Sequence, residues 1–80
     1  MQIQVLLFGI VADLVGENSI ILDIVEKSSV ASFKEQMISE YPQLKSYTTY
    51  AVAINEVYAQ NDAVIKANDI IAIIPPVSGG

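Results

Sequence analysis

Short apolar runs separated by polar turns predict several strands packed around one main helix in this 80-residue chain. The most apolar runs are residues 3–8 (IQVLLF) and 70–74 (IIAII), and we expect each to form a central strand that is largely buried on both faces. Residues 19–24 (SIILDI) follow a GENS turn and predict a further strand.

Helical spacing of apolar residues predicts one main helix over residues 30–41. Ser29 is a suitable N-cap, and Pro42 ends the pattern because the residue before a proline avoids the helical region. The apolar face of this helix consists of Val30, Phe33, Met37, Ile38 and Tyr41. A short helical turn over residues 10–15, closed by Gly16, competes there with a strand.

Residues 50–59 (YAVAINEVYA) indicate a hairpin with Asn55 and Glu56 at its turn, although Asn-Gly would be the stronger signal. Residues 61–69 then read as a loop. Placing the first and last strands side by side and parallel, with the helix across one face, is the simplest way to bury both. The expected fold is therefore α+β, a β-grasp with a mixed sheet of about five strands.

Composition excludes several classes of function. Hydrophobic residues make up 52% of the chain and charged residues 16%, which is typical of a folded domain. The net charge of −5, with four lysines and no arginine, argues against nucleic-acid binding. Without cysteine or histidine the chain lacks a thiolate, an imidazole base and the usual zinc ligands, so we expect no metal site. No segment is suited to a membrane span or signal peptide, and we expect a cytoplasmic protein.

The last six residues form a predicted flexible tail, residues 75–80, behind a domain of residues 1–74. Its stiff part is Pro75 and Pro76, which favour an extended backbone. Val77 is an apolar anchor and Ser78 is small and polar. Because Gly79 and Gly80 have no side chains, they could pass through a narrow channel and carry the terminal carboxylate into the active site of another protein. The alternative is a frayed terminus.

The segment IIPPVSGG after an AND turn, together with AVAINEVY and VLLFG upstream, resembles the MoaD family, the small sulfur-carrier subunits of molybdopterin synthase. The resemblance spans the whole chain, and PPVSGG is its specific part. Two features depart from the family pattern. Asn68 and Asp69 stand where the family usually has Gly-Asp, and the segment GIVADLVG lacks the basic residue often found after the first strand.

The resemblance implies a ubiquitin-like fold and a role in molybdenum cofactor biosynthesis. A MoeB-like adenylating enzyme would use ATP to activate the carboxylate of Gly80, which a sulfur donor would convert to a thiocarboxylate. The carrier would then dock on a MoaE-like large catalytic subunit, as part of a heterotetramer, and donate its sulfur to cyclic pyranopterin monophosphate. Gly79, Ser78, Val77, Pro76 and Pro75 would position the tail. The chain would be a non-catalytic subunit, inactive alone and without a bound cofactor.

Candidate partner surfaces lie on the body of the domain. Phe8 is a possible interface residue, although an aromatic residue ending a central strand is more often part of the core. We expect the sheet face away from the helix to be an apolar docking patch. Asp13 and Glu17 are candidates for contact with basic residues of a partner, but a solvated loop is the better explanation for them. Asn55 with Glu56 is a candidate for docking, but a hairpin turn explains this pair.

Three other functions remain open from the sequence. The first is a sulfur carrier for another pathway, such as thiamin synthesis or tRNA thiolation. The second is a ubiquitin-like modifier that forms isopeptide bonds through Gly80. The third is an interaction module with an inert tail.

Overall fold

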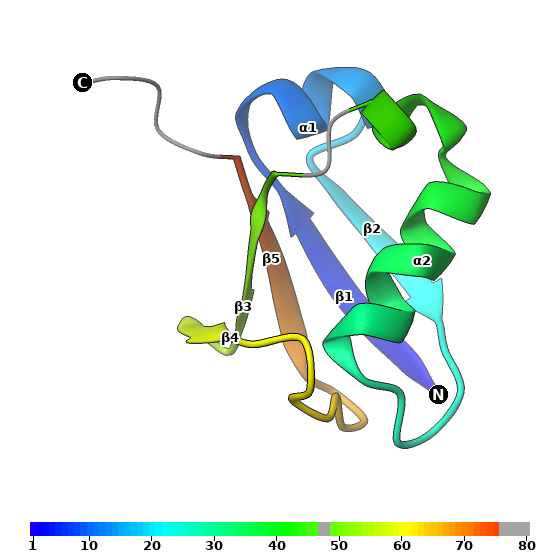
Figure 1. The fold of residues 1–80 in the computed structure, drawn as a ribbon, viewed down its shortest axis with the longest axis vertical. Coiled ribbons are helices and arrows are strands. Elements are labelled where there is room, and N and C mark those ends of the chain that lie inside the picture. The colour runs from blue at the N-terminus through cyan, green and yellow to red at the C-terminus, as the bar shows by residue number, and fades with distance from the viewer. Residues whose placement is uncertain (47–48, 76–80) are drawn as a thin grey trace.

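The computed structural model describes residues 1–46 and 49–75, which form a five-stranded sheet, two α-helices and a short 3-10 helix (Figure 1). In chain order the elements are β1 (Gln2–Leu7), α1 (Gly9–Val15), β2 (Ser19–Asp23), α2 (Val30–Glu40), the 3-10 helix η1 (Pro42–Ser46), β3 (Ala51–Ile54), β4 (Val57–Ala59) and β5 (Ile70–Ile74). The candidate tail residues 76–80 lie outside the described residues.

The strand order in the sheet is β2-β1-β5-β3-β4. The first and last strands are neighbours in its centre and run parallel, with Val5 beside Ile71, while the other pairs are antiparallel. Helix α2 lies across one side of this sheet (Figure 1). The predicted β-grasp architecture and its parallel central pair are therefore confirmed.

Both predicted helices form, and their ends follow from local hydrogen bonds. Ser29 caps α2, because its side-chain oxygen accepts a hydrogen bond from the backbone N–H of Ser32 at 3.2 Å. Helix α2 ends one residue before the predicted end, and Pro42 begins η1, which the sequence pattern missed. Gly16 closes α1 in the left-handed region (φ 86°), so the helical interpretation of this segment is confirmed over the strand.

The hydrophobic core lies between the sheet and α2. Alternate residues of β1 and β5 point toward the helix, whose Phe33 and Met37 are fully buried against them. The sheet side of this core consists mainly of Ile3, Val5, Leu7, Leu22, Val52, Ile71 and Ile73. Each such side chain contributes about 1.5–3 kcal/mol through burial. Within the described residues no polar or charged residue is buried, so this layer is a purely apolar one.

The expectation that residues 3–8 and 70–74 are buried on both faces is wrong. Burial alternates along both strands: Ile71 and Ile73 are buried, whereas Ile70 is 43% exposed. In the described part of the chain, a single layer of helix covers the sheet, on one side only. A continuous apolar run therefore does not signal a second covering layer here. It signals an apolar face that remains open.

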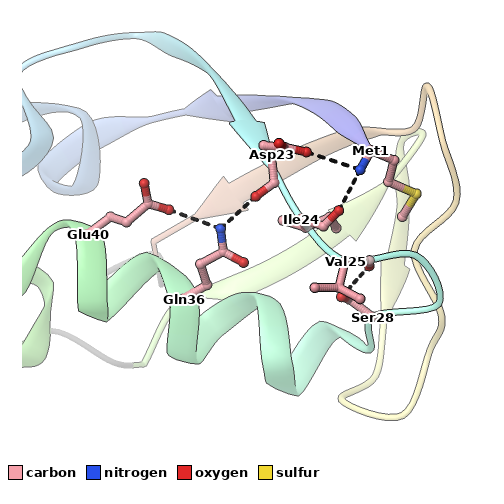
Figure 2. A network of polar contacts seen from close by, with 7 residues as sticks. All are labelled: Met1, Asp23, Ile24, Val25, Ser28, Gln36 and Glu40. Carbon is pink, nitrogen blue, oxygen red and sulfur yellow. Dashed lines mark hydrogen bonds and ion pairs between the residues drawn. The ribbon is translucent and has the colours of Figure 1, made fainter.

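Polar contacts join the N-terminus to the end of β2, and the end of β2 to α2 (Figure 2). The Met1 ammonium group donates to Asp23 Oδ1 at 3.0 Å and to the Ile24 carbonyl at 2.7 Å. Gln36 of α2 donates to the Asp23 carbonyl at 2.8 Å and to Glu40 Oε2 at 3.0 Å. These contacts lie at the opposite end of the sheet from the end of β5 (Figure 1).

Candidate functional site

The open face of the sheet is the candidate site, and the strand register brings its residues together. Leu6 of β1 pairs with Ala72 of β5, which pairs with Ala53 of β3, which pairs with Tyr58 of β4. These four residues form one row across four strands, on the side that α2 does not cover. Three of the four side chains are apolar and the fourth is an aromatic ring with one hydroxyl.

The polarity of the open face changes along β1. Gln2 and Gln4 occupy it near the start of the strand, whereas Leu6 and then Phe8 occupy it near the end. Because β1 and β5 are parallel, both strands end at the same edge of the sheet. The apolar part of the open face therefore lies beside the point where Pro75 follows β5.

An apolar hollow of about 560 Å³ occupies this part of the open face. Its lining residues are Leu6, Phe8, Ala53, Asn55, Glu56, Tyr58, Ile70, Ala72 and Ile74. Phe8 is 48% exposed and Tyr58 is 71% exposed, both large values for aromatic residues. An exposed apolar cluster that contains aromatic side chains is typical of a protein–protein docking surface.

The hairpin turn at the edge of the hollow is pinned to the start of β5. The Asn55 backbone N–H donates to the Ile70 carbonyl at 2.8 Å, and the Ile70 N–H donates to Asn55 Oδ1 at 2.9 Å. Asn55 Nδ2 also donates to Asp69 Oδ1 at 3.0 Å, and Asp69 Oδ2 accepts from the Lys66 N–H at 2.8 Å. This edge of the open face is consequently preorganised.

Gly9 contacts the first residue of the tail. It has a φ of +55°, in the left-handed region that favours glycine, and a Cβ atom built on it would lie 2.9 Å from Cγ of Pro75. That distance leaves no room for a side chain unless Pro75 shifts. The start of α1 therefore packs closely against the residue that follows β5.

The sequence-predicted site residues fall into three groups. Phe8 lies on the open face, so its alternative assignment to the core is wrong, and Pro75 is half-buried against Gly9. Pro76, Val77, Ser78, Gly79 and Gly80 lie outside the described residues. Asp13 and Glu17 are exposed near the end of α1 and line a different hollow, so the structure does not bring them to the open face.

Three contributors were missed from the sequence: Gly9, Ala53 and Tyr58. A signal for two of them was present. Once Leu6 is assigned to the open face, strand alternation and the antiparallel register select Ala53 and Tyr58. The contact between Gly9 and Pro75 has no such signal, because it joins residues at opposite ends of the chain.

The polar side chains that line the apolar hollow are those of Asn55, Glu56 and Tyr58. No cluster of potential metal ligands occurs among the described residues, and the whole chain has neither histidine nor cysteine. Burial raises the pKa of Tyr50, which precedes β3 and lies outside the apolar hollow. The arrangement is suited to docking a partner protein on an apolar surface. None of the described helices is long and apolar enough to span a bilayer.

Comparisons with known proteins give a family and a consistent set of relatives. The model of the ThiS family matches residues 5–80. The molybdopterin synthase sulfur carrier subunit of Dictyostelium discoideum is 39% identical over 83 residues, covering 99% of this chain and 96% of the relative.

Two solved structures extend the comparison. SAMP1 from Haloferax volcanii, a small archaeal modifier protein, has a TM-score of 0.88 at 25% identity and full coverage of both chains. A chain from the complex of subunits 1 and 2 of the Molybdopterin-converting factor of Helicobacter pylori has a TM-score of 0.70 at 23% identity, again with full coverage.

Proposed function

The chain belongs to the ThiS family, and we propose that it is the sulfur carrier subunit of a molybdopterin synthase. The observation that carries this proposal is the 39% identity, over almost the full length of both proteins, to the Dictyostelium discoideum subunit of that name. The geometry supports it, because an apolar open face lies beside the start of a tail that ends in two glycines.

The reacting group in this proposal is the carboxylate of Gly80. One of its oxygens attacks the α-phosphorus of ATP on a MoeB-like activating enzyme, pyrophosphate leaves, and an acyl-adenylate forms. Sulfur delivered at the oxidation level of hydrosulfide then attacks the acyl carbon, AMP leaves, and a thiocarboxylate remains. Adenylation is needed because oxide is a poor leaving group. The carrier itself holds no cofactor.

The open face is proposed to dock a MoaE-like large catalytic subunit, within a heterotetramer. The solved complex of subunits 1 and 2 from Helicobacter pylori, one chain of which shares this fold, supports such a partnership. Docking would place the tail in the partner's active site, where the thiocarboxylate gives its sulfur to cyclic pyranopterin monophosphate. The activating enzyme would use the same face at an earlier step, so the two partners would exclude each other.

The contact between Gly9 and Pro75 gives the tail a fixed starting point in this scheme. From Pro75 onward, five further residues reach about 17 Å when extended. A tail of that reach needs a constant origin relative to the docked face if its carboxylate is to meet the same reacting atoms in each cycle. Gly79 would serve the narrowest part of the partner's channel, where a side chain would collide.

The test is intact-mass analysis of the chain after incubation with ATP, its cognate activating enzyme and a sulfur donor. The proposal expects a gain equal to the mass difference between sulfur and oxygen, located on the C-terminal peptide and absent when ATP is omitted. A variant lacking Gly79 and Gly80 is the control and should gain nothing. An unmodified wild-type chain in the complete mixture would refute the proposal.

A ubiquitin-like modifier is the second candidate, favoured by the close structural similarity to SAMP1. In that case the activated Gly80 would form isopeptide bonds with lysines of other proteins. Peptide mapping of the host's proteins for lysines that carry the C-terminal Ser-Gly-Gly separates the two candidates. Abundant conjugates without a thiocarboxylate product in the synthase would favour the modifier.

A further inference from the structure

Glu56 stands where the hairpin turn favours glycine. The turn joins β3 to β4 through two residues, and both have positive φ: 50° at Asn55 and 73° at Glu56. Such a turn prefers Asn at its first position and Gly at its second. Asn55 meets the first preference, but Glu56 places a long side chain in the left-handed region, which costs conformational energy. The turn alone therefore gives no reason for glutamate.

The position of Glu56 on the apolar hollow suggests what the side chain does. Glu56 is the one charged residue among the nine that line the hollow. Within the described part of the chain, no lysine forms an ion pair with it. A carboxylate at the rim of an apolar docking surface is well placed to meet a cation on the partner, because the surrounding apolar contact reduces its access to water.

The surroundings of the turn hold this carboxylate in a defined place. The hydrogen bonds of Asn55 to Ile70 and Asp69 fix the backbone next to Glu56 before any partner arrives. A charged group on a preorganised turn loses little conformational freedom on binding. The net charge of −5 on the whole chain further favours a partner whose docking surface is basic.

We infer that Glu56 is a specificity residue, retained at the expense of turn stability, that pairs with a lysine or arginine of the large catalytic subunit when that subunit docks on the open face. The inference rests on the proposed function and adds the chemistry of the partner: an apolar surface with one cationic side chain opposite the β3–β4 turn. It also predicts that stability and binding respond in opposite directions at this position.

Two substitutions separate the two effects. Glu56→Gly gives the turn its preferred residue and should raise the melting temperature by about 4–8 °C. It should also weaken binding to the large subunit about tenfold or more. Glu56→Gln keeps the side-chain length and the strained backbone, so its melting temperature should stay at the wild-type value while binding still weakens about tenfold. The matched control is Glu35→Gln on the exposed side of α2, which should change neither quantity.

The experiment is calorimetric titration of each variant into the purified cognate large subunit at low and high salt. The wild-type chain should lose affinity as salt rises, and Glu56→Gln should lose less because the screened charge pair is missing. Binding of Glu56→Gln and Glu56→Gly at wild-type affinity would overturn this inference and leave the proposed function intact. Failure of the wild-type chain to bind the large subunit at all would overturn both.

Discussion

Toward the ends of β1 and β5 the two faces of the sheet are both apolar, but they differ in what covers them. On the helix side, Val5 and Ile71 pair across the central strands and are fully buried beneath α2. On the open side, the neighbouring pair Leu6 and Ala72 is equally apolar but only half-buried. The covered face holds the fold together. The open face exposes apolar surface that contributes far less to folding.

The same strands therefore carry two kinds of apolar surface, one that is buried in the core and one that stays exposed. An 80-residue domain buries only about 60% of the surface of its unfolded chain, so it has little stability to give up. Apolar residues on an uncovered face also raise the risk of aggregation. In the proposed account, that apolar surface is kept because partners cover it in turn.

The largest expected effect is on the covered face. Phe33→Ala should lower the free energy of unfolding by about 3–5 kcal/mol, because the ring is fully buried and its removal leaves a cavity. Urea denaturation followed by circular dichroism measures this. A loss below about 1 kcal/mol would show that α2 does not seal the core in the way described.

Phe8→Ala should weaken binding to the partner and leave the stability of the fold nearly unchanged. Because Phe8 is 48% exposed, we expect the free energy of unfolding to change by less than about 1 kcal/mol. We expect affinity for the large catalytic subunit to fall by about 2 kcal/mol, as for an aromatic residue at the centre of an interface. Calorimetric titration with the folded variant measures the second quantity. Unchanged affinity would remove Phe8 from the docking surface.

The contact between Gly9 and Pro75 gives a third, smaller difference. Gly9→Ala and Gly16→Ala both place a side chain in the left-handed region, at a cost of about 1–2 kcal/mol each. The added methyl group at residue 16 meets nothing within 4 Å, whereas at residue 9 it meets Pro75.

Both variants should therefore lose stability, but Gly9→Ala alone should slow sulfur transfer in a reconstituted synthase at a protein concentration that saturates binding. Equal transfer rates for the two variants would mean that the start of the tail does not depend on this contact.

The smallest effect concerns alkaline pH. Burial raises the pKa of Tyr50 above its ordinary value of about 10, so the folded state holds the phenol proton more tightly than the unfolded state does. Stability should be unaffected below that ordinary value and should fall as the pH rises through the pKa of the folded state. Tyr50→Phe should decline less steeply over this range in thermal melts at graded pH. Identical slopes would contradict the assignment.

The sequence was sufficient for the architecture because periodicity and capping residues agree with the fold. Ser29, Gly16 and the Asn55-Glu56 turn were each identified correctly, and the pairing of the two most apolar strands followed from the need to bury them. The 3-10 helix η1 was missed, since Pro42 signals only the end of a helix.

Less of the candidate site than of the fold could be predicted from the sequence. The sequence and the family resemblance were enough to identify the terminal glycines and to predict an open apolar face. The geometry of the site depends on contacts between distant segments: Gly9 with Pro75, and Asn55 with Asp69 and Ile70. Such contacts follow from the assembled sheet rather than from any local pattern.

The most direct test of the account is an NMR titration of the isotope-labelled chain with its unlabelled large catalytic subunit. The account predicts that the largest amide shifts fall on the open face, at Leu6, Phe8, Tyr58 and Ala72. The outer side of α2, at Ser32, Glu35 and Ser39, should stay unperturbed. Shifts concentrated on α2 with a silent open face would contradict the central claim that the uncovered side of the sheet is the docking surface.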